Sequence, residues 1–138
     1  MDAVWQLYKQ TVFLLEQPLN SQLSFAIITA YNPQGQQCNL GYNHSQDNKL
    51  QADIDILGCV YRKLWGCSPA LDYAEKSWMI STDKTTAIKL AEKYQQNALY
   101  WVEQGELLLL PCLLKMKSEE SIGAFDTRCF YQQANCCI

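Results

Sequence analysis

Residues 24–31 constrain the fold of this chain more than any other segment. Their sequence, SFAIITAY, is dense in the β-branched and aromatic residues that favour extended strands. The run stops at Asn32-Pro33-Gln34-Gly35, whose proline and glycine mark a turn. The segment therefore predicts a well-defined strand, so the fold must contain a sheet.

Two segments on either side of this strand have the apolar periodicity of amphipathic helices. Residues 2–17 place their apolar side chains at helical spacing. A longer helix is predicted from Ser45, which can cap it, as far as Gly66. Gly58 interrupts this second helix, which suggests close packing against a neighbouring element. We expect the apolar stripe of the long helix to face the sheet.

Further elements follow in the second half of the chain. Residues 76–81 predict a second strand, and Asp83 can cap a third helix that stops at Asn97. Residues 98–103 and 106–110 predict two more strands joined by a two-residue turn, which makes them a hairpin.

The order of these elements is α-β-α-β-α-β-β. It predicts an α/β fold, with α+β as the alternative: a two-layer sandwich in which helices cover a small mixed sheet of about four strands. Residues 1–138 are expected to form a single domain, since one core commonly takes about 100–200 residues. Residues 115–138 form a polar to cysteine-rich C-terminal segment without a clear period.

Charge and hydropathy narrow the possible partners. Eleven basic and fourteen acidic residues give a net charge of −3, so the broad positive surface of a duplex-binding protein is missing and no nucleic acid partner is expected. The apolar runs are far shorter than the roughly 18–20 residues of a spanning helix, and the N-terminus lacks the basic region of a secretory signal. We therefore expect no membrane association and a cytoplasmic location.

Seven cysteines are many for a chain of 138 residues. They are Cys38, Cys59, Cys67, Cys112, Cys129, Cys136 and Cys137. An odd number without a signal peptide predicts reduced thiols, and without a C-x-x-C spacing no metal or other cofactor is expected. The thiols of the C-terminal segment, Cys129 included, should react faster than those of Cys59 and Cys112.

The sequence contains none of the short motifs that bind nucleotides or carry hydrolytic catalysis. It has no Walker loop, no G-x-G-x-x-G, no G-x-S-x-G and no H-E-x-x-H. The single histidine, His44, lies near Cys38, but nothing in the sequence orients the two side chains as a nucleophile pair. A solvated residue near a helix start is the simpler interpretation of His44.

Four short motifs together resemble a known family. They are FAIITAYNP at 25–33, Asn48 with Leu50, EKS at 75–77 and QNA at 96–98. Over about residues 23–110 the chain resembles the bacterial family called domain of unknown function 3293. Its members show a strand ending in T-A-aromatic-N-P, an Asn opening the next helix, a Glu before the second strand and a later Q-N-A. This chain departs from the pattern at Tyr94-Gln95, where the family usually has an aromatic-glycine pair. The resemblance implies a shared fold, and because the family has no known function, no activity can be transferred from it.

The first candidate site depends on how the first two strands run. If they are parallel, four polar residues gather at the carboxyl ends of the strands, where ligands bind open α/β sheets. These ligand-binding candidates are Thr29, Asn32, Asn48 and Asp83. Rigid amides at such a place could recognise a ligand by hydrogen bonds without any charge.

A second group is the alternative site. Glu75, Gln96 and Asn97 would then lie at the opposite end of the sheet, where they would serve in capping and packing. An antiparallel second strand would instead bring Glu75 beside Thr29. The amides also have structural interpretations, with Asn48 in the first turn of its helix and Asn97 as a helix terminator.

Three classes of function remain open. We favour a small non-catalytic ligand-binding or regulatory module, because the residues of acid–base and metal chemistry are scarce. The second class is a hydrolase or transferase with Glu75 as general base, which would have to share a pocket with Thr29 or Asn48. The third is a protein-interaction module, which would need two or more of its tryptophans exposed together. These are Trp5, Trp65, Trp78 and Trp101. The ligand and the oligomeric state are not specified by the sequence.

Overall fold

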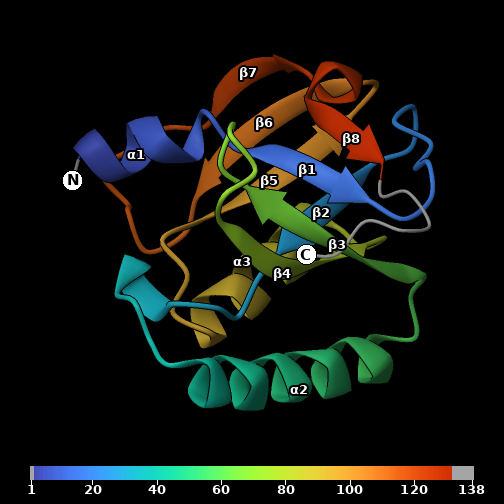
Figure 1. The fold of residues 1–138 in the computed structure, drawn as a ribbon. Helices are drawn as coiled ribbons and strands as arrows, with labels where there is room; N and C mark the ends of the chain where they lie inside the picture. The colour runs from blue at the N-terminus through green and yellow to red at the C-terminus, as the bar shows by residue number, and fades with distance from the viewer. Residues whose placement is uncertain (1, 132–138) are drawn as a thin grey trace.

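The computed structural model describes residues 2–131, which form one strongly curved sheet with helices packed around it (Figure 1). The strands are β1 (Val12–Leu15), β2 (Phe25–Ile28), β3 (Tyr61–Cys67), β4 (Ala74–Ile80), β5 (Ala98–Glu103), β6 (Glu106–Pro111), β7 (Glu120–Ala124) and β8 (Cys129–Tyr131). The helices are α1 (Asp2–Tyr8), α2 (Leu40–Leu57) and α3 (Lys84–Lys93), with the 3-10 turns η1 (Pro33–Gly35) and η2 (Phe125–Arg128). The strand order is β7-β6-β5-β2-β4-β3-β1-β8.

The mixed α/β class is confirmed, whereas a two-layer sandwich with about four strands is wrong. Within the described residues the sheet has eight strands and there are three α-helices. Each pair of neighbouring strands is antiparallel except β1 and β8, which are parallel. β2 is therefore antiparallel to β4, with Ala26 opposite Ile80 and Ile28 opposite Trp78. The parallel arrangement on which the first candidate site depends does not occur.

The segment 2–17 forms a short helix and a strand instead of one long helix. α1 ends at Tyr8, and β1 pairs with β3 on one side and with β8 on the other. Phe13, Leu14 and Leu15 are all buried because both faces of this strand are covered. A short apolar run fits a buried strand as well as a buried helix, so periodicity alone gave the wrong element here.

The predicted helix 45–66 also divides between a helix and a strand. α2 begins at Leu40, where the Asn39 side chain accepts a hydrogen bond from a backbone N–H of the first turn. It ends at Gly58, whose φ of 69° lies in the left-handed region that glycine adopts without steric cost. Gly58 is thus the C-cap of α2 rather than an interior glycine, and Gly66 lies within β3.

The second half of the chain agrees more closely with prediction. β5 has the predicted bounds, β6 follows it after a two-residue turn, and Asp83 caps α3 by accepting the N–H of Thr86 at 2.7 Å. The C-terminal segment differs, because parts of it form β7 and β8 and extend the sheet at both edges. β6 therefore has a neighbour on each side. The rest of that segment, 132–138, lies outside the described residues.

The two faces of the sheet have separate cores. In β2, Ala26 and Ile28 pack in one cluster with buried residues of α2 and α3. Phe25 and Ile27 point the opposite way and pack in a second cluster with residues of β1 and η2. This alternation is the period of two expected for a strand covered on both faces. Figure 1 shows α2 and α3 together below the sheet, while α1 lies on the other side.

The second cluster is enclosed because the sheet curls. Three strands separate β1 from β5 in the strand order, so in a flat sheet they would be about 19 Å apart. Yet the rings of Phe13 in β1 and Tyr100 in β5 meet edge to face with centroids 5.1 Å apart. The sheet therefore bends round until strands from its two halves touch across an interior.

The described cysteines differ in their surroundings. Cys112 is buried, and burial raises the pKa of its thiol to about 12. Burial likewise raises the pKa of Cys129 to about 12, and its S–H donates to the carbonyl of Phe125. The fast reaction expected for Cys129 is therefore not supported by its position in β8. Cys136 and Cys137 lie outside the described residues, and the reduced state of the thiols stays a prediction.

We predict that native Cys38 and Cys59, which are both partly exposed, alkylate at least about tenfold faster than Cys112 and Cys129 at pH 8. A thiol with a pKa near 12 is thiolate in only about one molecule in ten thousand at that pH. Iodoacetamide labelling over time, read by peptide mass spectrometry, measures the rates. In guanidinium chloride all four rates should converge, and native Cys112 labelling as fast as Cys38 would contradict the buried placement.

Candidate ligand-binding site

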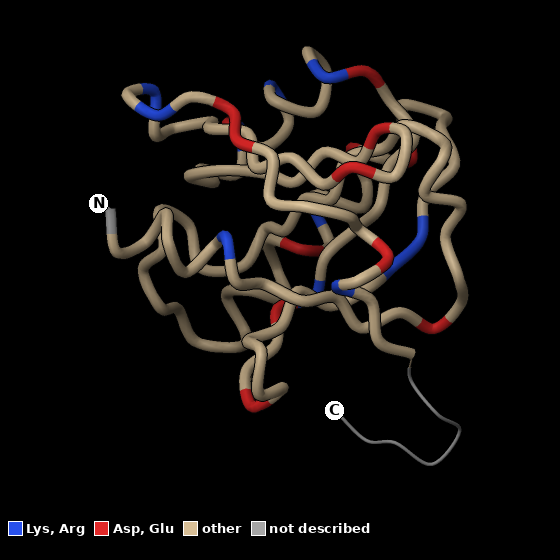
Figure 2. The backbone as a smooth tube through the Cα atoms, turned by 90° about the horizontal axis from the view of Figure 1, so that it is seen from above, with Lys and Arg blue, Asp and Glu red and all other residues tan. Residues whose placement is uncertain are grey.

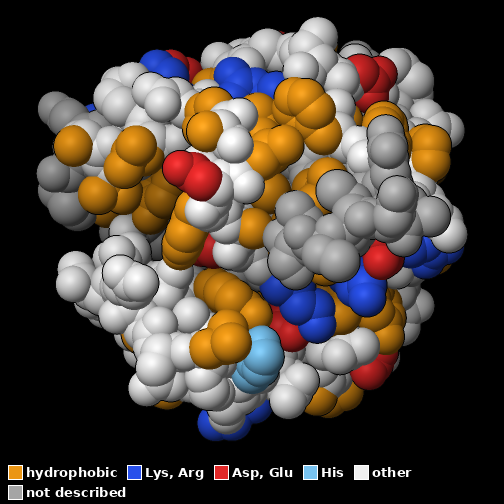
Figure 3. Space-filling model, in the orientation of Figure 1, with side chains coloured by type: hydrophobic (Ala, Val, Ile, Leu, Met, Phe, Trp, Pro, Cys, Tyr) orange, Lys and Arg blue, Asp and Glu red, His pale blue; other side chains and the backbone are white. Residues whose placement is uncertain are grey.

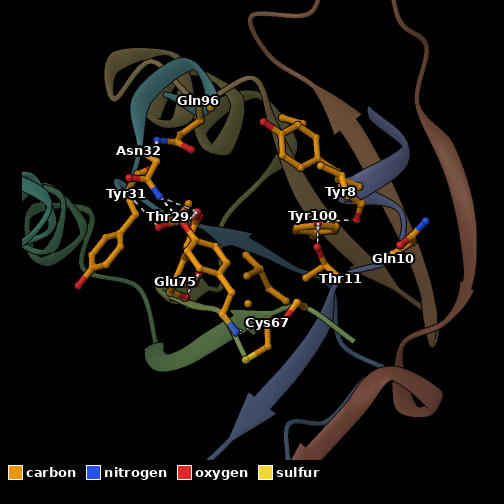
Figure 4. A pocket seen from close by; sticks show the side chains of 18 of the residues that line it. Tyr8, Gln10, Thr11, Thr29, Tyr31, Asn32, Cys67, Glu75, Gln96 and Tyr100 are labelled. Atoms are coloured by element: carbon orange, nitrogen blue, oxygen red, sulfur yellow. Dashed lines mark hydrogen bonds between the residues drawn. The ribbon is translucent and has the colours of Figure 1, made fainter. Parts of the chain in front are cut away.

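A pocket of about 420 Å³ opens into the interior of the curled sheet (Figure 4). The buried side chains of Phe13, Ile27 and Leu109 border it, and the partly exposed Ala98 and Tyr100 of β5 line it. Val4 and Leu7 of α1 form part of its border. A cavity of this size falls in the range of about 300–1,000 Å³ that is typical of small-molecule sites.

Strand alternation brings Thr29 and Glu75 to this pocket. Thr29 lies two residues beyond Ile27, and Glu75 lies four residues before Met79, so both are on the inner face of the sheet. Since β2 and β4 are antiparallel, the end of β2 lies beside the beginning of β4, and the Thr29 hydroxyl donates to the carbonyl of Lys76 at 2.7 Å. The antiparallel pairing therefore places Thr29, of the first candidate group, beside Glu75, of the second.

Glu75 is held by two hydrogen bonds to the same oxygen. The Asn32 amide donates from Nδ2 to Oε2 at 2.9 Å, and the Tyr73 hydroxyl donates to Oε2 at 2.7 Å. No hydrogen bond from residues 2–131 reaches the other oxygen, Oε1. Among the described residues that line the pocket, Glu75 is also the one that carries a formal charge. The carboxylate is thus fixed in direction and keeps one oxygen available.

The charge of Glu75 influences the tyrosines around it. Burial and then the hydrogen-bonded carboxylate raise the pKa of Tyr73. Burial is also the largest cause of the raised pKa values of Tyr8, Tyr31 and Tyr100, and the negative charge of Glu75 adds to each of them. These phenols stay protonated at neutral pH, and the one formal charge among the described lining residues is negative.

Asn32 connects Glu75 to α2. Its φ of 49° lies in the left-handed region, which Asn tolerates better than most residues. Its Oδ1 accepts from the N–H of Cys38 at 2.9 Å and from Asn43 Nδ2 at 3.0 Å, while its own N–H donates to Asn43 Oδ1 at 3.0 Å. Both polar atoms of the Asn32 side chain are therefore engaged, and its role is to position Glu75.

The remaining residues at this end of the sheet have structural partners. The Thr29 hydroxyl accepts from the N–H of Tyr31 besides donating to a carbonyl, so it has no free proton. Gln96 lines the pocket and donates to the carbonyls of Tyr31 and Tyr94 at 3.2 Å. Asn97 donates to the Tyr8 hydroxyl at 3.1 Å and so ties α1 to the sheet. The left-handed residue after α3 is Gln95 rather than Asn97.

Two of the predicted ligand residues lie away from the pocket. Asn48 is exposed in the middle of α2, since that helix begins eight residues before it rather than three. Asp83 is exposed at the N-terminus of α3, beyond the carboxyl end of β4. Because β4 is antiparallel to β2, that end of β4 is the one farthest from Thr29. The grouping of Asn48 and Asp83 with Thr29 and Asn32 is therefore wrong.

Asn43, Tyr73 and Tyr8 were not predicted from the sequence to belong to the site. Asn43 belongs to the buried stripe of α2, which continues through Asp47 to Leu50 and Ile54 at helical spacing. Asp47, buried like Asn43, accepts from Trp78 Nε1 at 2.8 Å and pairs with Lys76 at 2.9 Å. Polar residues in the apolar stripe of a helix were the signal that could have found Asn43.

The fold and the pocket define a small mixed α/β protein with a curled, mainly antiparallel sheet around a carboxylate-bearing cavity. A family model described as protein of unknown function (DUF3293) matches residues 28–99, just over half of the chain, and the chain belongs to that family. The predicted resemblance is confirmed. The match includes Glu75 and the amides of Asn32 and Asn43 that hold it. No curated protein and no solved structure compared with the chain matches it.

We predict that Asn43→Ala lowers the free energy of unfolding by about 1–3 kcal/mol, because it leaves the buried N–H of Asn32 without a partner and removes one of the two hydrogen bonds to its Oδ1. Asn48→Ala on the same helix removes an exposed amide and should change stability by less than about 0.5 kcal/mol. Urea denaturation of both variants measures the difference. If Asn43→Ala and Asn48→Ala lowered the free energy of unfolding equally, or if Asn48→Ala lowered it more, the stabilising role of the Asn32–Asn43 hydrogen bonds would be contradicted.

Proposed function

We propose that this protein binds a small organic molecule in the pocket and acts as a non-catalytic ligand-binding module. The observation that carries the proposal is a cavity of about 420 Å³ in which a carboxylate is held by Asn32 and Tyr73 while its Oε1 stays available. Apolar walls supply contact area, and a few fixed polar groups supply orientation. Both kinds of surface are present here.

The polar groups of the pocket support binding more than catalysis. The described lining residues include no His, Lys or Arg, so an oxyanion or a leaving group has no cation to stabilise it. The Thr29 hydroxyl, one potential nucleophile of the pocket, donates to a backbone carbonyl. Most other polar members are amides and hydroxyls with protein partners, which suits recognition by shape and hydrogen bonding.

A second candidate is a hydrolase or transferase with Glu75 as general base. Its condition, that Glu75 share a pocket with Thr29 or Asn48, is met for Thr29. A carboxylate with one oxygen fixed and the other available has the geometry of a base that accepts a proton from a bound molecule or a water. Mass spectrometry of the bound compounds after long incubation distinguishes a binding module from an enzyme. Conversion of a compound to a product by the wild type, but not by Glu75→Gln, would favour an enzyme.

Tryptophan-based protein interaction has little support. Trp5, Trp78 and Trp101 are 2%, 4% and 4% exposed, and Trp65 alone is partly exposed. Two exposed tryptophans side by side were the condition for this function, and the described residues do not supply them. Large aromatic anchors near the surface are what such interfaces depend on.

The expected partners and location stay proposals. Basic and acidic residues are interspersed along the backbone rather than gathered on one side, which supports a small-molecule partner over nucleic acid (Figure 2). Helices in residues 2–131 are all too short or too polar to cross a membrane. We propose a cytoplasmic location on the sequence argument.

We predict that Gly66→Leu abolishes ligand binding. Gly66 is opposite Glu75 in the β3–β4 pair, and a Cβ there would meet Thr11 and Ser77 side-chain atoms at 3.6 and 3.8 Å, which are ordinary contacts inside the pocket. A Cβ therefore fits at position 66 without displacing backbone, and the rest of a leucine side chain takes up part of the cavity beside Glu75. Ligand-observed NMR with a library of small organic molecules detects binding to the wild type and its loss in the variant.

Gly41→Leu is the matched control, because it makes the same change in α2, outside the residues that line the pocket. It should bind like the wild type. Circular dichroism checks that each variant is folded, and Gly66→Ala gives a smaller step in the same direction. Binding that survives in folded Gly66→Leu would contradict the pocket as the site.

A further inference from the structure

The pocket has an uneven distribution of charge. Among the described lining residues Glu75 alone is formally charged, and the neighbouring cation, Lys76, points to the opposite face of β4. There Lys76 pairs with Asp47 of α2 at 2.9 Å. An anionic ligand would therefore meet the carboxylate with no lysine or arginine of the described lining to balance it, whereas a cation would meet an available oxygen.

The pocket also has two chemically different ends. Glu75, Thr29 and Asn32 gather on one side of it, and Tyr8, Tyr100 and Thr11 lie on the other (Figure 4). Tyr8 is the last residue of α1, and Val4 and Leu7 of the same helix make the border of the pocket apolar. A ligand that fills the pocket needs one polar end and one apolar end.

Aromatic rings line the side of the pocket opposite Glu75 (Figure 4). The Tyr100 hydroxyl donates to the carbonyl of Tyr8 at 2.6 Å, and the Tyr8 hydroxyl accepts from Asn97. The Tyr100 hydroxyl proton is thus engaged, whereas no described residue accepts the proton of the Tyr8 hydroxyl, so Tyr8 offers a ligand a hydrogen-bond donor as well as ring surface. Ring surfaces attract cations and apolar groups alike. On the outside, hydrophobic side chains gather on the face that carries α1, where Leu7 is exposed (Figure 3).

We infer that the ligand is a protonated amine with an apolar, aromatic-sized body. Its ammonium group donates to Glu75 Oε1, and its body lies along Tyr100 and Tyr8 toward Val4 and Leu7 of α1. The inference rests on the proposed binding function and names the ligand class of that same pocket. A charge-assisted hydrogen bond to a fixed carboxylate is among the stronger polar contacts available to a small molecule.

Three probes of nearly equal size test the inference: 2-phenylethylamine, 2-phenylethanol and 3-phenylpropionate. Isothermal titration calorimetry at pH 7 should show the amine binding at least about tenfold more tightly than the alcohol, and the carboxylate weakest. Glu75→Gln should remove the preference for the amine. Added salt should weaken amine binding and leave alcohol binding nearly unchanged, because only the former is an ion-pair contact.

Two further variants make the result specific to position 75. Glu75→Asp keeps the charge and should retain part of the amine preference. This result would show that the charge at position 75, and not the mere substitution of Glu75, sets the preference. Glu119→Gln makes the same change at an exposed glutamate outside the pocket lining and should bind like the wild type.

The outcomes separate this inference from the proposed function. Alcohol binding as tight as amine binding, or an amine preference that persists in Glu75→Gln, would overturn the amine inference. The binding function would then still stand if Gly66→Leu abolished binding of the alcohol. If no compound of the NMR library and none of the three probes bound the wild type, both proposals would be overturned.

Discussion

The antiparallel pairing of β2 with β4 is the contact on which the pocket depends. It places the end of β2, with Thr29 and the following Asn32, beside the beginning of β4, where Glu75 lies. In a parallel pair these residues would lie at opposite ends of the sheet. The curl of the sheet then brings Phe13 of β1 against Tyr100 of β5 and forms the interior into which the pocket opens.

Local signals in the sequence were sufficient for α3, β5 and β6, but not for β7 and β8. Asp83 is a strong N-cap followed by a periodic helix, and residues 98–103 and 106–110 flank a two-residue turn. The first half failed where the apolar pattern was ambiguous. Residues 12–15 read as helix because four apolar side chains in a row carry no period, and only pairing with β3 and β8 makes them a strand.

The candidate site divides in the same way. Thr29, Asn32, Glu75 and Gln96 were found because polar residues at strand and turn boundaries are visible in one sequence. Asn48 and Asp83 were misplaced because their positions depend on where α2 begins and on the direction of β4, which are tertiary properties. Asn43 was missed since its partner, Asn32, is recognisable only once the turn after β2 meets the first turns of α2.

The pairing of β1 with β8 has a consequence for the order of assembly. β1 lies near residue 13 and its parallel partner near residue 129, so this contact closes a loop that includes almost every other strand. Contacts of such long range slow folding because the entropy of closing the loop must be lost first. During synthesis β1 emerges early. The edge of β1 that pairs with β8 stays unpaired until β8, the last described strand, leaves the ribosome. Phe13 and Thr11, which line the pocket from this side, reach their final surroundings only then.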